Sequence, residues 1–338
     1  MFLTRLSCAL TALLAICAPS LAQESFWRGK TISLYVGGTA GSGVDVASRV
    51  IAKYMTRHMP GNPAISVQVM PGAGGIRLLD HLRTAAPKDG TALGTIPPGT
   101  LLEPLTGARK AAYSMTDFNA IGAAGKDVSL CIASTDSGFT TIDQVKQKQM
   151  VVAGTGAGAN PDTYPLILNE VLGTKFKLIT GYVGTQETSM AIERGEADGR
   201  CGWSWASIKA TRPAWVRDHK ISYLLQFALK KNADFPDTPL ALDFVTREED
   251  RQLLTLLFAP LDLSKPFLAP PGVPAERIAE LRKAFMDTMN DEDYRTEAVK
   301  LSDEPVDPTD GAEMQKLIAA IYATPAPVVD RLRGMLAR

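Results

Sequence analysis

Short apolar runs alternate along this chain with longer segments whose apolar residues recur at helical spacing. The runs 31–36 and 65–69 have the composition and length of β-strands. The segments that follow them, 44–57 and 75–84, place apolar residues three and four positions apart, as amphipathic helices do. This alternation predicts an α/β protein with parallel strands. Further strands are predicted at 92–96, 128–133, 150–153, 176–180, 197–203 and 221–227, and residues 274–338 are predicted to be mostly helical.

Glycine-rich turns connect several of the predicted strands to the helices that follow. Two of them, 37–45 and 71–75, come early in the chain, and a third begins at Gly154. Where a glycine turn connects a strand to the beginning of a helix, backbone N–H groups are exposed and can bind an anion. Each turn alone is equally compatible with a plain tight connection between a strand and a helix. Taken together, the three turns predict a shared ligand cleft.

Residues 1–22 have the pattern of a secretory signal peptide. Arg5 supplies a positive charge, 6–18 form an apolar core, and 20–22 read Ser-Leu-Ala, a small-x-small cleavage site. We therefore expect cleavage after Ala22 and a periplasmic protein. A lipoprotein signal at Cys17 is disfavoured, because the preceding Ile16 is large.

The charge balance and the length restrict the possible classes of function. Lys and Arg together number 36, as do Asp and Glu, and no basic run indicates a nucleic acid or an anionic membrane surface as partner. Without its first 22 residues, the 338-residue chain keeps 316, enough for two domains with separate cores. Its 3 histidines lie in no triad or metal-binding motif. We expect no enzyme activity, no metal and no cofactor.

A nucleotide-binding oxidoreductase is an alternative that the residues mostly argue against. Residues 154–159 match the glycine fingerprint of dinucleotide-binding folds and follow a predicted strand. Such a site also requires an acidic residue about 20 positions further on. Lys175, Lys177 and Thr180 occupy that region instead.

Two cysteines remain once the signal peptide is removed. Cys131 and Cys201 both lie in predicted strands. An oxidising compartment permits a disulfide between them, whereas two free buried thiols would act as small apolar residues. If they are bridged, we expect their Cα atoms to lie about 4.4 to 6.8 Å apart.

Short motifs rich in glycine and proline run through the whole mature chain. They include 41–45 (GSGVD), 70–75 (MPGAGG), 86–90 (APKDG), 154–158 (GTGAG), 181–184 (GYVG), 194–198 (RGEAD) and 269–274 (APPGVP). Their order and spacing resemble the Bug-type periplasmic solute-binding receptors of the tripartite tricarboxylate transporter family. The resemblance implies a two-lobed periplasmic-binding-protein fold of type II, with a ligand cleft between the lobes. It places lobe 1 at 23–127 plus 228–338 and lobe 2 at 128–227, with crossing strands near 125–130 and 225–230.

The resemblance also implies a function. Such a receptor binds a small organic acid by hinge closure and delivers it to the membrane permease subunits of a tripartite tricarboxylate transporter. We expect a monomer. A periplasmic ligand sensor coupled to a signalling partner is the alternative that the sequence leaves open.

The candidate ligand-binding residues come mainly from the glycine turns. Because the loops 39–44, 72–75 and 154–160 contain no Lys or Arg, we expect backbone and hydroxyl donors rather than a buried arginine to hold the ligand carboxylate. Asp45 either caps a helix only or also binds the ligand. Arg200 forms an unusual cluster with Trp203 and Trp205, either a cleft wall or a packed helix start. The full set is Thr39, Gly41, Ser42, Asp45, Gly74, Thr155, Gly156, Asn160, Gly184, Thr185 and Arg200.

Overall fold

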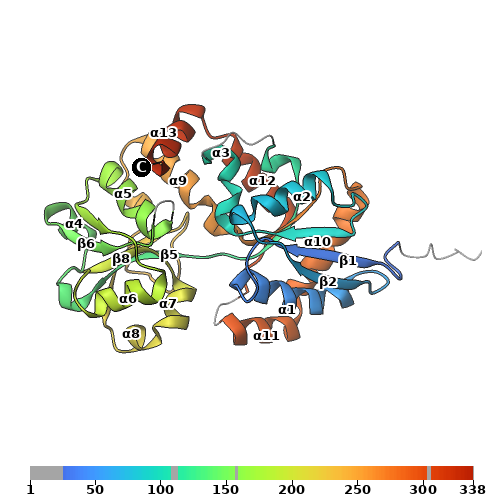
Figure 1. Cartoon of the computed structure of the whole chain (residues 1–338), viewed down its shortest axis with the longest axis horizontal. Helices are drawn as coiled ribbons and strands as arrows, with labels where there is room; N and C mark the ends of the chain where they lie inside the picture. Colours follow the sequence, from blue (N-terminus) through green and yellow to red (C-terminus); the bar gives the residue numbers. More distant parts are fainter. Residues whose placement is uncertain (1–25, 108–112, 157–158, 303–305, 338) are drawn as a thin grey trace, which may run out of the picture.

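The strands of the protein form two sheets that lie in two adjacent lobes. The structure is a computed structural model and describes residues 26–107, 113–156, 159–302 and 306–337. Each sheet has helices on both of its faces, so the predicted two-lobed α/β fold is confirmed (Figure 1). The predicted signal peptide and residues 157–158 of the third glycine turn lie outside the described residues.

The first sheet has the strand order β11-β4-β10-β3-β1-β2. β1 runs parallel to β2 and β3, as the strand and helix repeats of the sequence predict, whereas β10 runs antiparallel to both β3 and β4. The antiparallel strands come from the later part of the chain, which returns to this lobe. The strands are β1 (Thr31–Val36), β2 (Ala64–Val69), β3 (Ala92–Thr95), β4 (Asn119–Gly125), β10 (Ser264–Ala269) and β11 (Thr309–Asp310).

The second sheet has the strand order β7-β6-β8-β5-β9. β6 runs parallel to β7 and β8, so these three strands have their carboxyl ends at one edge of the sheet. β5 pairs antiparallel with β8 and with β9. The strands are β5 (Ser129–Ser134), β6 (Met150–Ala153), β7 (Phe176–Ile179), β8 (Gly199–Ser204) and β9 (Ile221–Phe227).

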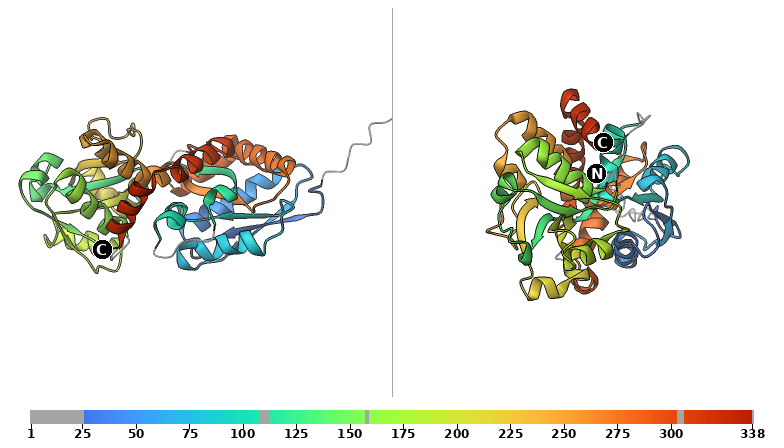
Figure 2. Two further views of the ribbon diagram at one scale, coloured as in Figure 1. Left: turned by 90° about the horizontal axis from the view of Figure 1, so that it is seen from above. Right: turned by 60° about the vertical axis from the view of Figure 1, so that its left-hand side comes forward.

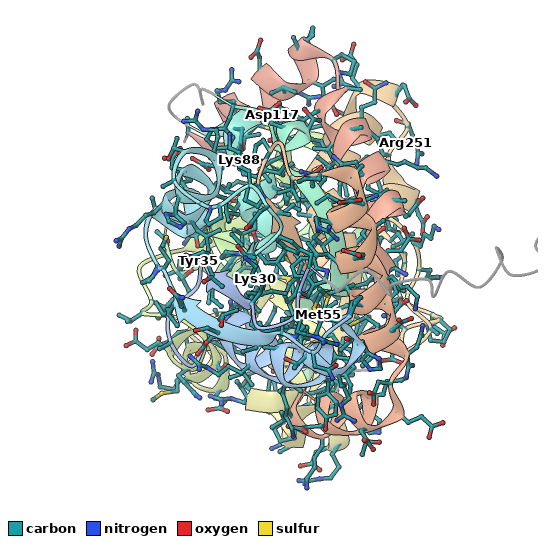
Figure 3. All side chains as sticks on the ribbon, turned by 90° about the vertical axis from the view of Figure 1, so that its right-hand side faces the viewer. Lys30, Tyr35, Met55, Lys88, Asp117 and Arg251 are labelled. Atoms are coloured by element: carbon teal, nitrogen blue, oxygen red, sulfur yellow. A yellow bond between two sulfur atoms is a disulfide. The ribbon has the colours of Figure 1, made fainter. Side chains whose placement is uncertain are left out.

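Each sheet has one layer of helices on each of its two faces. On the first sheet, Met55 of α1 (Gly43–His58) and Phe285 of α10 (Ala275–Asn290) lie in the hydrophobic cluster of one face. Leu78 of α2 (Ile76–Thr84) and Ile318 of α12 (Gly311–Tyr322) lie in the cluster of the other face. Met55 lies among the packed side chains, whereas Lys88 lies on the surface (Figure 3). On the second sheet, α4, α5, α9 and α13 pack on one face and α6, α7 and α8 on the other.

The bounds of the helices are close to the predicted segments where the sequence is strongly periodic. The helices are α1 (Gly43–His58), α2 (Ile76–Thr84), α3 (Glu103–Thr106), α4 (Ile142–Gln147), α5 (Asn160–Leu172), α6 (Thr185–Glu193), α7 (Trp205–Thr211), α8 (Pro213–Arg217), α9 (Glu248–Phe258), α10 (Ala275–Asn290), α11 (Glu292–Ser302), α12 (Gly311–Tyr322) and α13 (Ala326–Leu336). None of the helices in the described part is both long enough and apolar enough to span a bilayer.

The chain passes between the lobes at three places. It leaves lobe 1 between β4 and β5, returns through the 3-10 segment Ala259–Leu263 into β10, and passes back between α12 and α13. The first two crossings lie side by side, because the Asp127 amide donates to the Leu261 carbonyl at 2.8 Å. The return therefore lies later in the chain than the predicted 225–230.

Two helices that we assigned to lobe 1 pack with lobe 2 instead. Leu253 and Leu254 of α9, and Val328 and Leu332 of α13, are buried in the hydrophobic cluster of the second sheet. The C-terminal helix accordingly lies against the second lobe (Figure 2). α13 also contacts α3 of lobe 1, where Arg333 donates to the Leu105 carbonyl at 2.6 Å, so this helix lies between the lobes. Sequence periodicity does not reveal which partner an apolar helix face packs against.

Cys131 and Cys201 form a disulfide between the neighbouring strands β5 and β8. Their Cα atoms are 3.8 Å apart, closer than the predicted range. The register of the two strands shifts between Leu130 and Ile132, and this irregularity brings the cysteine backbones together. The alternative of two free buried thiols is wrong for this structure.

Candidate ligand-binding site

The start of α1 is held together by contacts within its own loop. Ser42 is the N-cap residue, and its hydroxyl accepts from the Asp45 amide at 3.4 Å. The Asp45 carboxylate accepts from the Gly41 amide at 2.8 Å and pairs with Nε of Arg49 at 3.0 Å. The Gly41 amide is therefore engaged inside the protein. The amides of Gly43 and Val44, the first two helical residues, have no acceptor within the helix.

Asp45 is a helix-capping residue in this structure. Its side chain is 4% exposed. Burial raises its pKa, but the hydrogen bond from Gly41 and the pairing with Arg49 outweigh burial, so that the pKa lies below its usual value of 3.8. The charged carboxylate thus stabilises the folded protein above the usual pKa, and this contribution is lost as the pH falls through the folded pKa.

We expect Asp45→Asn to weaken the helix start without affecting the ligand. The amide oxygen still accepts from Gly41, but the charge that favours the helix N-terminus and Arg49 is lost, so the free energy of unfolding falls by about 1 kcal/mol at neutral pH. Urea denaturation at several pH values measures this, and the difference disappears in acid. A loss of ligand affinity above threefold would instead assign Asp45 a direct contact with the ligand.

The third glycine turn is filled by a carboxylate of the protein itself. Asp162, on the first turn of α5, is 3% exposed. It accepts hydrogen bonds from the amides of Thr155 at 2.6 Å and Gly156 at 2.9 Å, and from the hydroxyl of Thr180. A Cβ atom on Gly154 would lie 2.6 Å from this carboxylate, which explains the glycine. The expectation that these two amides bind a ligand carboxylate is wrong here, because an internal acid already occupies them.

Arg200 is a buried cation beneath the start of α6. Its side chain is on β8, is 6% exposed, and donates through Nη1 to the hydroxyls of Thr188 at 2.8 Å and Thr185 at 3.3 Å. The guanidinium stacks on the Trp203 ring at 4.9 Å. No carboxylate of the described residues pairs with it, and its buried Nε has no acceptor among them. Burial lowers the pKa of Arg200 to about 10, and the charge of Asp162 only partly offsets this.

The other predicted site residues make no hydrogen bond or ion pair with this cation in the part of the chain that the structure describes. Gly184 is the N-cap residue of α6, and its φ of 110° is a conformation that favours glycine. Asn160 begins α5 with an exposed side chain, and Gly74 lies in an exposed turn after β2. Thr39 accepts through its carbonyl from the Ser42 amide at 3.1 Å.

Trp203 and Trp205 have different surroundings, although they are two residues apart. Trp203 is buried between Arg200 and the indole of Trp215. Trp205 donates from its indole to Asp234 at 2.9 Å and packs edge-on against Phe235. The predicted cluster is therefore divided: Arg200 stacks on Trp203, whereas Trp205 is a packing residue.

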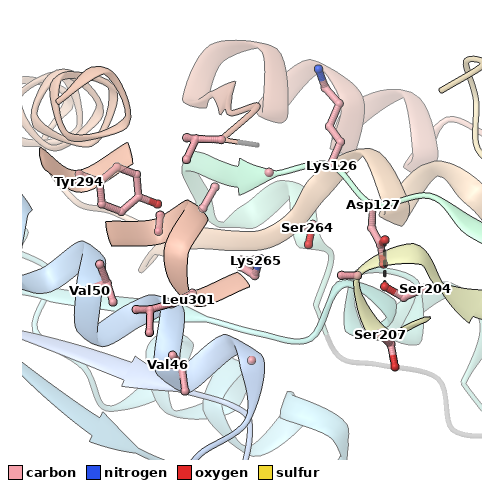
Figure 4. Close-up of a pocket in the computed structure, with 17 residues that line it drawn as sticks. Val46, Val50, Lys126, Asp127, Ser204, Ser207, Ser264, Lys265, Tyr294 and Leu301 are labelled. Atoms are coloured by element: carbon pink, nitrogen blue, oxygen red, sulfur yellow. Dashed lines mark hydrogen bonds between the residues drawn. The ribbon is translucent and has the colours of Figure 1, made fainter. Parts of the chain in front are cut away.

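A cavity of about 430 Å³ lies between the lobes, beside the hinge (Figure 4). α1 and α11 provide one wall, the two hinge crossings provide another, and the start of α7 closes it from lobe 2. Near the hinge, Ser204 donates to the Asp127 carboxylate at 3.1 Å. None of the residues predicted for the site lines this cavity. Tyr294, Ala298 and Leu301 recur at helical spacing on one face of α11, and this spacing is a sequence signal for the cavity wall that the glycine turns do not contain.

The structure thus gathers the predicted residues into separate groups. Gly41, Ser42 and Asp45 lie together on lobe 1, whereas Thr185 and Arg200 lie together on lobe 2. No hydrogen bond or ion pair joins the two groups within the part of the chain that the structure describes.

Comparisons with known proteins agree with this architecture. No protein-family model matches the chain. A UPF0065 protein encoded in the gbd 5′ region of Cupriavidus necator is 28% identical over 311 residues, covering 88% of this chain and 86% of that protein.

Solved structures with the same fold cover most of this chain. A TctC solute binding protein from Polaromonas has a TM-score of 0.69 at 19% identity, covering 89% of this chain and 98% of its own. MatC from Rhodopseudomonas palustris with bound malate has a TM-score of 0.57 at 19% identity, with coverages of 91% and 99%. The periplasmic binding protein BugD has a TM-score of 0.59 at 19% identity, with coverages of 90% and 97%.

One of these structures is named as a solute binding protein and another as a periplasmic binding protein. The relative from Cupriavidus necator extends the similarity over most of the chain at the level of sequence. The comparisons confirm the resemblance to the Bug-type solute-binding receptors of the tripartite tricarboxylate transporter family that the sequence motifs indicated.

Proposed function

We propose that this protein is an exported receptor that binds a small carboxylate-bearing solute between its two lobes. In this proposal the signal peptide is cleaved after Ala22, and the receptor delivers the solute in the periplasm to the permease subunits of a tripartite tricarboxylate transporter. Among proteins of the same fold, one structure contains malate and another contains adipate, both of them carboxylates.

The observation that supports this function best is Arg200. Burying an arginine without an acidic partner costs free energy, and such cations in folded proteins are usually paired. A solute carboxylate at the start of α6 supplies the missing acceptor, and the Thr185 hydroxyl and the first amides of the helix add neutral donors. This replaces our sequence-based expectation of a site without a buried arginine.

Hinge closure completes the site in this proposal. The crossings at Asp127 and Leu261 are short and hydrogen-bonded to each other, so they can act as a hinge while each lobe stays rigid. The solute binds lobe 2 first, and the donors of lobe 1, including Ser42 and the Gly43 amide, reach it on closure. Exclusion of water then strengthens the charged contact. The solute shifts the population toward the closed form by its extra contacts there.

A thermal-shift screen of the mature protein against organic acids tests the proposed function. An acid at 100 times its dissociation constant should add about 2.7 kcal/mol to the free energy of unfolding. Malate, adipate and aromatic acids are suitable probes, and the corresponding neutral amides are the matched controls. The proposal fails if no acid raises the melting temperature, or if each amide raises it as much as its acid.

A further inference from the structure

The cavity beside the hinge has one apolar and one polar side. Val46, Ala47 and Val50 line it from α1, and Ala298 and Leu301 line it from α11. Most of the polar side chains that line it come from the hinge crossings, among them Lys126 and Lys265, and from Ser204 and Ser207 at the start of α7, whereas Tyr294 of α11 adds a hydroxyl. Figure 4 shows the valines of α1 and Leu301 facing the same space, with Asp127 and Ser204 on the opposite side. The cavity is thus amphipathic, with a hydrocarbon wall on lobe 1.

Part of this apolar wall is left in contact with solvent. Val46 is 39% exposed and Leu301 is 56% exposed, although both are large apolar residues. Exposed apolar surface that rims a concave site is typical of ligand-binding grooves. A volume of about 430 Å³ also lies in the range of small-molecule pockets.

Arg200 and the cavity face the same edge of the second sheet. α6 follows β7 and α7 follows β8, and both strands run parallel to β6, so the two helices start at the same edge. The strands are offset, because Val152 of β6 is level with Gly199 of β8. Arg200 therefore lies level with the end of β6, and α7 begins five residues further along β8, about 16 Å beyond it. The Trp203 ring connects the two places, because Arg200 stacks on it and its indole donates at 3.0 Å to Ser207, which lines the cavity.

We propose that the hinge cavity binds the hydrocarbon body of the solute, so that the receptor prefers a monocarboxylate with an aromatic or branched body to a compact hydroxy acid. This inference rests on the proposed function, because it places the carboxylate of the same solute at Arg200. The body then extends along the edge of the sheet from α6 to α7 and covers the apolar faces of α1 and α11. Because both lobes line the cavity, burial of this body favours the closed form.

Calorimetry with 3-phenylpropanoate and malate as probes tests the preference. We expect the wild-type protein to bind 3-phenylpropanoate at least tenfold more tightly than malate. Ala47→Phe fills the cavity from α1, and Ala298→Phe fills it from α11. Each variant should lower the ratio of the two affinities at least tenfold. Two variants on different helices guard against the failure of either one to fold, which the melting temperature reveals.

Ala279→Phe is the matched control, because Ala279 is exposed on α10 and lies outside the cavity. It should leave the affinity ratio unchanged. The inference is overturned if malate binds as tightly as 3-phenylpropanoate, or if both cavity variants fold and keep the wild-type ratio. Failure of every acid to bind would instead overturn the proposed function, so the two failures are distinguishable.

Discussion

Arg200→Gln should lower the affinity for the bound acid at least about 100-fold, a loss of about 2.7 kcal/mol. The guanidinium is buried, and its Nε has no acceptor among the described residues, so a solute carboxylate gains a charge-assisted hydrogen bond that glutamine cannot replace. Stability should change in the opposite direction. Because burial disfavours the charged guanidinium, the neutral variant should unfold at the same or a higher denaturant concentration. Calorimetry and urea denaturation of the same samples measure both effects.

Arg212→Gln is a matched control for this experiment. Arg212 also lies over a tryptophan ring in lobe 2, at 5.7 Å from that of Trp215, and its buried Nε likewise makes no hydrogen bond among the described residues. It differs from Arg200 in that a Glu193 carboxylate oxygen lies 3.5 Å away as an ion-pair partner. Its charge is therefore paired within the protein, and we expect its replacement to leave the affinity within threefold. Arg200→Lys should give an intermediate loss, because lysine keeps the charge but not the planar fork. If Arg200→Gln binds the acid as tightly as the wild-type protein, the arginine is a packing residue and the carboxylate binds elsewhere.

The sequence predicted the strands with a strong β-forming composition well and missed others, such as β4 and β10 of the first sheet. β1, β6 and β9 were predicted with the bounds that the structure has, since each is a compact run of β-forming residues between turns. β4 reads Asn-Ala-Ile-Gly-Ala-Ala-Gly and β10 contains Pro266, so neither carries a strong strand signal. Their strand conformation depends on pairing with each other in the first sheet, a tertiary effect.

The candidate site shows a different limit of sequence reasoning. The glycine pattern correctly marked a turn at Gly154 that binds an anion, but the anion is the Asp162 carboxylate seven residues after Thr155. No sequence rule distinguishes an internal carboxylate from a ligand at such a turn. Arg200 was predicted as a site residue because an arginine close to two tryptophans is unusual. The sequence does not show that this arginine is buried without a carboxylate partner, because its burial results from the packing of α6 over β8.

Removing the disulfide should destabilise the protein more than any other change considered for lobe 2. The bridge joins residues 70 positions apart, so it restricts a long loop of the unfolded chain and contributes about 4 kcal/mol on the chain-entropy model. The double variant Cys131→Ala with Cys201→Ala avoids leaving an unpaired thiol. Urea denaturation should show a lower midpoint and a steeper dependence on urea, because the unfolded chain without the cross-link is more expanded.

Reduction of the wild-type protein supplies the control for this double variant. Both samples lack the cross-link, so their urea midpoints should agree, and any remaining difference reports the two sulfur atoms lost from the core. Thiol titration of the denatured, unreduced mature protein should find no free thiol. Two free thiols per chain, or a double variant as stable as the oxidised wild-type protein, would show that the strands β5 and β8 hold lobe 2 together through their hydrogen bonds and packing alone.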